Sequence, residues 1–178
     1  FLDGNHDNHE LLSHDSTEMV QLSEAVTYLP RGHVWEWGGK KLMALGGAVS
    51  VDKNRRTTFI SWWPSETISH ADTERAISNG EGEDIYIMFT HDAPAGVSVL
   101  EEYLKETAYM YGAKLEGESA AHRRTMREVV ERVQPRFLFH GHYHHRYEDT
   151  LTFKNRNFTR VIGLGRDGQA HSWFVVSL

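Results

Sequence analysis

Four histidines are concentrated in the segment Phe139-His140-Gly141-His142-Tyr143-His144-His145. Neutral imidazole is the most common nitrogen ligand for transition metals in proteins. His142 and His144 are separated by one residue, and on extended backbone this spacing points both side chains to the same side. The segment therefore predicts a metal site, although taken alone it is equally compatible with a polar, histidine-rich turn.

The residues before the histidines indicate the elements that must position them. Phe137-Leu138-Phe139 is a short apolar run, which predicts a buried strand that ends where the histidines begin, and Gly141 permits a sharp turn there. Gly4-Asn5-His6-Asp7 and Thr90-His91-Asp92 also follow apolar residues. Loops at the carboxyl ends of strands converge in layered α/β folds, so we expect the three segments to meet.

The composition excludes several classes of site. The chain has no cysteine, which removes disulfides, thiolate metal sites and a cysteine nucleophile and suits a reducing compartment, so we expect a cytoplasmic location. A formal net charge of -6, with histidine neutral, gives no electrostatic signature of general nucleic-acid binding. No apolar run approaches transmembrane length, so we expect no membrane partner. A length of 178 residues is that of one domain.

The three segments, in this order, resemble the motifs of the calcineurin-like metallophosphoesterases, with Gly4-Asn5-His6-Asp7, then His91-Asp92-Ala93-Pro94, then Gly141-His142-Tyr143-His144. The resemblance covers residues 4–144, and the segments 46–52 and 62–66 are similar to those of small bacterial and phage members. It implies an α/β (α+β) fold, a four-layer sandwich of two mixed β-sheets flanked by helices. It also implies a single metallophosphoesterase domain over residues 1–178.

The resemblance implies metal-dependent hydrolysis of a phosphoester, by a phosphodiesterase or phosphatase that acts on a nucleotide or another small phosphodiester. Asn5, His91 and His142 would ligate one divalent metal ion and His144 a second, and these donors suit manganese, iron, zinc or nickel. A hydroxide bridging the two ions would attack phosphorus. His6, held by Asp7, would stabilise or protonate the leaving oxygen.

Residues between the motifs are predicted to contact substrate. Asp52, Arg55 and Arg56 belong to a polar stretch expected at the rim of the site, where they could contact substrate, although a solvated loop is the more common outcome for such residues. Of these we assign Asp52 and Arg55 to the substrate. Trp62 and Trp63 are adjacent, and neighbouring side chains on a strand face opposite sides. We expect one to pack in the core and the other to offer a stacking surface, and we assign Trp63 to the substrate.

The sequence departs from the family at its start. The family opens with a strand that carries Asp-x-His, followed by a Gly-Asp segment whose aspartate bridges the metals, and neither precedes Gly4 here. We expect either a fragment whose first strands are missing, with the remaining ligands upstream, or a natural short form with half a site.

Two other classes of function stay open. The missing ligands favour a catalytically impaired scaffold that binds proteins, whereas the retained Asn5-His6-Asp7 oppose it. A nucleic-acid-binding module would use Trp62, Trp63, Arg55 and Arg56, and the negative net charge opposes that alternative.

Periodicity and turn residues predict the remaining elements. Residues 34–45 are expected to form a hairpin around Gly38-Gly39. His122 is expected to pack on the apolar face of its helix rather than to bind metal. We expect a buried strand over 84–90, helices over 8–26, 70–79, 98–111 and 122–133, a mobile segment or lid over 112–117, and closing strands over 146–153, 159–164 and 171–176.

Overall fold

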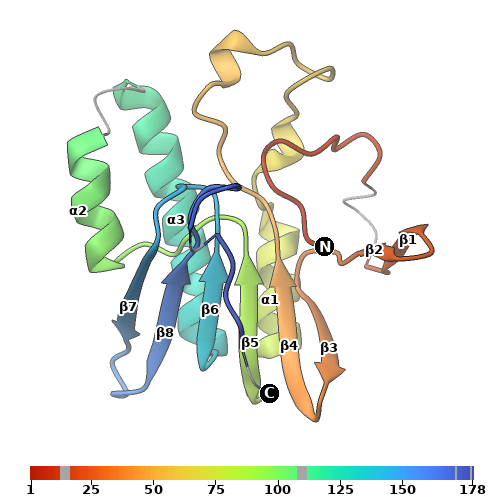
Figure 1. The fold of residues 1–178 in the computed structure, drawn as a ribbon, viewed down its shortest axis with the longest axis vertical. Helices are drawn as coiled ribbons and strands as arrows, with labels where there is room; N and C mark the ends of the chain where they lie inside the picture. Colours follow the sequence, from red (N-terminus) through yellow and green to blue (C-terminus); the bar gives the residue numbers. More distant parts are fainter. Residues whose placement is uncertain (13–16, 108–111, 171, 177) are drawn as a thin grey trace.

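A six-stranded mixed sheet forms the centre of the computed structural model, which describes residues 1–12, 17–107, 112–170, 172–176 and 178 (Figure 1). The strand order is β3-β4-β5-β6-β8-β7. The strands are β3 His33–Trp37, β4 Lys40–Leu45, β5 Ile85–Thr90, β6 Phe137–His140, β7 Tyr147–Thr152 and β8 Phe158–Gly163. The four inner strands are parallel and both edge strands are antiparallel, so the inner strands end at one edge of the sheet.

The two central strands, β5 and β6, are apolar on both faces, as expected for parallel strands that are covered on both sides. On one face, Met88 and Leu138 are fully buried in the main core. On the other face, Ile87 and Phe139 belong to a smaller cluster with Leu42 and Ile162. The predicted strands over 84–90 and 137–139 are therefore confirmed.

Helices cover one face of the sheet (Figure 1). They are α1 His70–Gly80, α2 Ser98–Thr107 and α3 Ala113–Val133. α3 buries Met126, Val129, Val130 and Val133 in the main core, as their helical spacing predicts. The C-terminal segment crosses the opposite face (Figure 1). The ring of Phe174 in this segment lies 5.3 Å from that of Phe139 between centroids.

The predicted hairpin over 34–45 is confirmed as β3 and β4. Gly38 and Gly39 have φ of 58° and 73°, the left-handed pair that a two-residue turn of this type requires. The helices over 70–79 and 122–133 are confirmed, as is that over 98–111 up to Thr107, because residues 108–111 lie outside the described part. The strands over 146–153 and 159–164 are also confirmed.

Two local predictions are wrong. Residues 8–12 and 17–26 do not form a helix, and residues 13–16 of that prediction lie outside the described part. Instead, β1 Val20–Ser23 and β2 Val26–Tyr28 make a small antiparallel sheet, in which Tyr28 is buried. Residues 172–176 form no strand, since Phe174 packs on the sheet face rather than pairing at an edge; residue 171 is outside the described part. In the segment 112–117, α3 already begins at Ala113, and the expected role of this segment as a mobile part or lid stays a prediction.

The predicted mixed α/β class is confirmed, with one six-stranded and one two-stranded sheet among the described residues. The four-layer sandwich stays a prediction. Within the described ranges, no helix combines the length and apolar character needed to cross a membrane.

Candidate functional site

Three predicted metal ligands come together at the carboxyl ends of β5 and β6. Parallel pairing sets Phe89 beside Phe139, so the residues that follow the two strands are neighbours. The imidazoles of His91 and His142 are 5.2 Å apart between ring centroids. Asn5 reaches them from the first loop, where its Oδ1 accepts a hydrogen bond of 3.0 Å from Nε2 of His91. The expected meeting of the three segments is therefore confirmed for these residues.

Asn5 is buried and its orientation is fixed by a hydrogen-bonded chain. Its amide nitrogen donates to Oγ of Ser50 at 3.0 Å, and the Ser50 hydroxyl donates to the carboxylate of Glu66. Because the nitrogen of the amide is occupied by Ser50, the oxygen is the atom that faces His91.

Gly4 makes the close approach of the first loop possible. A Cβ atom at this position would lie 2.5 Å from Cε1 of His91 and 2.7 Å from its Nδ1, closer than carbon atoms can pack. The backbone nitrogen of Gly4 donates to Oδ2 of Asp7 at 2.6 Å. Glycine is therefore required at position 4 because any side chain there would collide with the ring of His91.

Both central histidines are held in the neutral form. Burial and, to a smaller extent, the neighbouring His142 lower the pKa of His91 to about 4, although Asp92 offsets part of the shift. Burial also lowers the pKa of His142. Neutral imidazole carries the lone pair that a metal ligand needs, so both rings are in the form that binds metal near neutral pH.

The geometry predicted for His142 and His144 requires a correction. The backbone after β6 is not extended, because His142 and His144 have left-handed φ of 65° and 55° and the Tyr143 nitrogen donates to the Gly141 carbonyl. The side chains therefore do not follow the alternation of a strand. His142 lies beside His91, whereas His144 is exposed, although both line the same cavity.

His6 and Asp7 are arranged differently from the prediction. The Asp7 carboxylate accepts from the Gly4 backbone, and the imidazole of His6 lies instead against the guanidinium of Arg56. Arg56 Nη2 is 3.0 Å from Nε2 of His6, and its Nε donates to Asp52 at 2.9 Å. Partial burial and the charge of Arg56 lower the pKa of His6. The predicted hydrogen bond between His6 and Asp7 is not formed.

The predicted substrate-binding residues have three different positions. Asp52 lines the cavity and holds Arg56. Arg55 is exposed and is not among the residues that line the cavity. Trp63 is buried at 8% exposure, with its ring 6.2 Å from that of His9, so it is a core residue and not a stacking surface.

Arg56 is the arginine of the polar stretch that lies against His6, whereas the sequence-based assignment to substrate kept only Arg55 of the two. It follows Arg55 in the same polar stretch, and no sequence signal separates the two arginines. The i, i+4 pair with Asp52 is the only local hint. Only the folded loop, which includes the short 3-10 helix η1 Lys53–Arg55, turns Arg56 toward His6.

The carboxylate of Asp92, the residue that follows His91, is a buried hydrogen-bond acceptor. Asp92 is fully buried and accepts hydrogen bonds from Nδ1 of His122 at 2.6 Å and from the Tyr143 hydroxyl at 2.5 Å. The backbone nitrogen of Ile68 donates to Nε2 of His122, so Nδ1 of that ring carries the proton. Although burial opposes ionisation, the hydrogen bonds from His122 and Tyr143 hold the pKa of Asp92 below its usual range. The expected packing role of His122 is confirmed.

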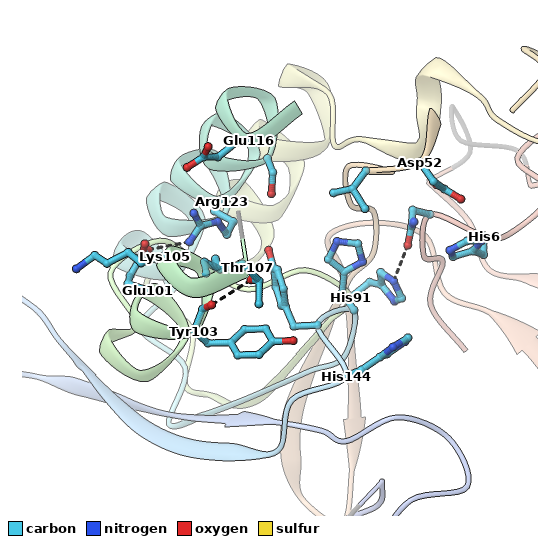
Figure 2. Close-up of a pocket in the computed structure, with 16 residues that line it drawn as sticks. His6, Asp52, His91, Glu101, Tyr103, Lys105, Thr107, Glu116, Arg123 and His144 are labelled. Atoms are coloured by element: carbon cyan, nitrogen blue, oxygen red, sulfur yellow. Dashed lines mark hydrogen bonds and ion pairs between the residues drawn. The ribbon is translucent and has the colours of Figure 1, made fainter. Parts of the chain in front are cut away.

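A cavity of about 500 Å³ lies beside the candidate ligands, and its lining includes Asn5, His91 and His142 (Figure 2). His6, Asp52, His91 and His144 lie at one end of it, and residues from α2 and α3 lie at the other, in the view of Figure 2. The cavity is large enough for a small organic phosphoester.

The donor set fits one divalent cation. Asn5 Oδ1 and the neutral rings of His91 and His142 are a suitable oxygen and nitrogen set, and a cation would take the place of the proton that His91 now shares with Asn5. Within the described ranges, no group of three or more His, Asp, Glu or Cys side chains is arranged to hold a metal, and no carboxylate joins Asn5. A second cation therefore lacks its ligands in this part of the chain.

Searches of protein-family models and of curated proteins find no match to this chain.

Proposed function

We propose that this protein is a metal-dependent phosphoester hydrolase of the calcineurin-like metallophosphoesterase type. The observation that carries the proposal is the meeting of Asn5, His91 and His142, from three distant segments, at one end of a cavity. His6 borders the same end, and the guanidinium of Arg56 lies against its ring. Oxygen and imidazole donors beside a guanidinium are a combination suited to a phosphate ester. The proposal includes the four-layer family fold.

In this proposal, Asn5, His91 and His142 hold a divalent cation, which when bound supplies Lewis-acid polarisation of a phosphoryl oxygen. The guanidinium of Arg56 donates to the phosphoryl group and, through its contact with His6, orients that ring. Nη2 of Arg56 lies nearer to Nδ1 of His6 than to Nε2. Because Arg56 can only donate, Nδ1 accepts from it and the neutral ring carries its proton on Nε2. That N–H can donate a hydrogen bond to the leaving oxygen and stabilise it.

The proposal also includes a second divalent cation, bound by His144 and by further ligands from outside the described residues. Both cations would be manganese, iron, zinc or nickel. The substrate class is a nucleotide or another small phosphodiester. A cytoplasmic location stays a prediction from the absence of cysteine.

The test is hydrolysis of bis(4-nitrophenyl) phosphate by protein stripped with chelator and reconstituted with manganese. We expect activity that needs the metal and falls at least about 100-fold in His91→Gln and His142→Gln, since each removes a ligand. His33→Gln is the matched control, because His33 lies on the edge strand β3, away from the lining of the cavity, and should retain full activity. Unchanged activity in His91→Gln and His142→Gln would show that the reaction belongs to a contaminant or to another site.

The second candidate is a scaffold that binds proteins without catalysis. It is favoured by the absence of a carboxylate beside Asn5, His91 and His142 in the described part of the chain. Metal binding without any hydrolysis in the same experiment would favour this candidate over the hydrolase.

A further inference from the structure

The buried carboxylate of Glu66 lies two hydrogen bonds away from the candidate ligand Asn5. Glu66 is 1% exposed and is not among the residues that line the cavity. The metal and phosphate chemistry proposed above gives it no part, although a charge that is removed from water lowers stability unless hydrogen bonds compensate it. We infer that Glu66 is a positioning residue, which acts through the Ser50 hydroxyl to turn the oxygen of the Asn5 amide toward a cation. The inference rests on the proposed function only in placing a divalent cation at that oxygen.

Glu66 sets the direction of the hydrogen bonds that lead to Asn5. An ionised carboxylate can only accept, so the one proton of the Ser50 hydroxyl is donated to Oε2 of Glu66. The backbone carbonyl of Asn5 is a second acceptor within reach, at 3.3 Å, and it lies farther away than the carboxylate. The hydroxyl oxygen accepts from Nδ2 of Asn5, at 3.0 Å. The oxygen of the same amide is therefore left to face Nε2 of His91, at 3.0 Å.

The groups around Glu66 need an acceptor on each of its two oxygens. Oε1 accepts from the backbone nitrogen of Trp63 at 3.4 Å and lies 3.7 Å from Nη1 of Arg56. The contact with Trp63 caps the short 3-10 helix η2 Pro64–Glu66, which accounts for Oε1 but not for Oε2. A glutamine would supply one acceptor and one donor in these two places. Because two donors face Oε1, we expect the glutamine oxygen to stay there and its nitrogen to face Ser50.

A nitrogen in the place of Oε2 would reverse the hydrogen bonds to Asn5. The substituted side chain would donate to Ser50, and the hydroxyl proton of Ser50 would be donated to Oδ1 of Asn5. The amide would then turn, with Nδ2 toward His91, and an N–H group cannot ligate a cation. The backbone of Glu66 is held independently, since its carbonyl accepts from the nitrogen of Ala48 at 2.8 Å. The substitution therefore changes the direction of the hydrogen bonds and leaves the loop in place.

Glu66→Gln is measured first in the protein without metal, near pH 7.5. In the wild type, Nε2 of His91 donates to Asn5, so nitrogen NMR of this neutral ring should find the proton on Nε2. In Glu66→Gln we expect a second form of His91, with the proton on Nδ1, because Nε2 then accepts from Asn5. Manganese binding, measured by calorimetry, should be about tenfold weaker. The matched control is Glu116→Gln, at an exposed position on the wall of the same cavity, which should keep the wild-type proton position and affinity.

Asn5→Asp separates positioning from other effects of the substitution. A carboxylate offers an oxygen on both sides, so its orientation no longer matters. In this background, Glu66→Gln should not weaken manganese binding. Equal weakening with and without Asn5→Asp would overturn the inference, and so would an unchanged proton position on His91 in Glu66→Gln.

Thermal melting followed by circular dichroism shows whether Glu66→Gln is folded. If it is not, Ser50→Ala decides, because it removes the linking hydroxyl and keeps the carboxylate. Manganese binding about tenfold weaker in Ser50→Ala supports the inference, and wild-type binding overturns it. Absence of hydrolysis in the wild type would contradict only the proposed function. If the wild type binds no manganese, the proposed function fails and the proton position on His91 alone decides the role of Glu66.

Discussion

The side-chain oxygen of Asn5 lies 3.0 Å from Nε2 of His91, although 86 residues separate them in the sequence. The contact joins the first loop to the carboxyl end of β5, and His142 is a second neighbour of the same ring. It is the centre of the candidate site, and each of the following predictions tests one part of its surroundings.

Divalent metal should stabilise the protein. Addition of manganese, zinc or nickel at about 100 times the dissociation constant is expected to raise Tm by roughly 5–10 °C, since a ligand that binds only the folded state adds about 3 kcal/mol. His142→Gln should abolish the shift. His144→Gln is the comparison, because His144 is exposed and is not one of the three ligands Asn5, His91 and His142 of the first cation. Loss of the shift in His144→Gln as well would show that His144 belongs to the first site.

Gly4→Ala should displace the ring of His91. The added Cβ would lie 2.5 Å from Cε1 of that ring, so we expect a loss of about 2–3 kcal/mol in the free energy of unfolding, measured in urea, together with weaker metal binding. The matched control is Gly117→Ala, in α3, where an added Cβ meets nothing within 4 Å. That variant should be about 0.5–1 kcal/mol more stable than the wild type. Equal effects of the two substitutions would contradict the packing of Gly4 on His91.

Arg56 and Arg55 should differ strongly in their effect on hydrolysis. Arg56 contacts His6 and Asp52, whereas Arg55 is exposed. We expect Arg56→Met to lower kcat/KM for bis(4-nitrophenyl) phosphate by about 10- to 100-fold, because a charge-assisted contact to the phosphoryl group is lost. Arg55→Met should stay within about twofold of the wild type. The reverse order would restore Arg55 as the substrate-binding residue.

His122→Phe should destabilise the fold. The substitution leaves the carboxylate of Asp92 fully buried without its 2.6 Å hydrogen bond. The expected cost is about 3 kcal/mol in the free energy of unfolding. The double variant His122→Phe, Asp92→Asn should recover part of this loss, since it removes the buried charge. No recovery would mean that the cost comes from ring packing and not from the carboxylate.

Acid should weaken the fold partly through His9. His9 is buried at 4% exposure and its Nε2 is 2.8 Å from the carbonyl oxygen of Gly4. Burial lowers its pKa in the folded state below the usual value of 6.5. A histidine with a lowered folded pKa contributes stability that is complete above pH 6.5 and is lost as the pH falls through the folded pKa. Urea unfolding at pH 7.5 and 5.5 should therefore show a smaller loss for His9→Gln than for the wild type. His70→Gln, at an exposed position, should lose as much as the wild type.

The sequence by itself determined the strands and helices whose periodicity is continuous. Three features could be predicted from neighbouring residues alone. They are the apolar runs before His91 and His142, the paired glycines of the β3–β4 turn and the apolar face of α3. The same local logic placed histidines after two parallel strands, and the convergence of those strand ends follows from the fold class. Asn5, His91 and His142 could therefore be predicted to meet, while their role as ligands stays a prediction.

Only the tertiary structure decided which side chains complete the site. Arg55 and Arg56 are chemically alike and adjacent. It is Arg56 whose guanidinium donates to the backbone carbonyls of Asn5 and Ser61, and these contacts hold it at the site. The left-handed backbone of His142 and His144 overrides the alternation that their spacing suggests. Trp63 is buried by packing from distant segments, and Arg123 of α3 lines the cavity where it forms an ion pair with Glu101 of α2. These outcomes depend on contacts between residues far apart in the chain, which local spacing does not encode.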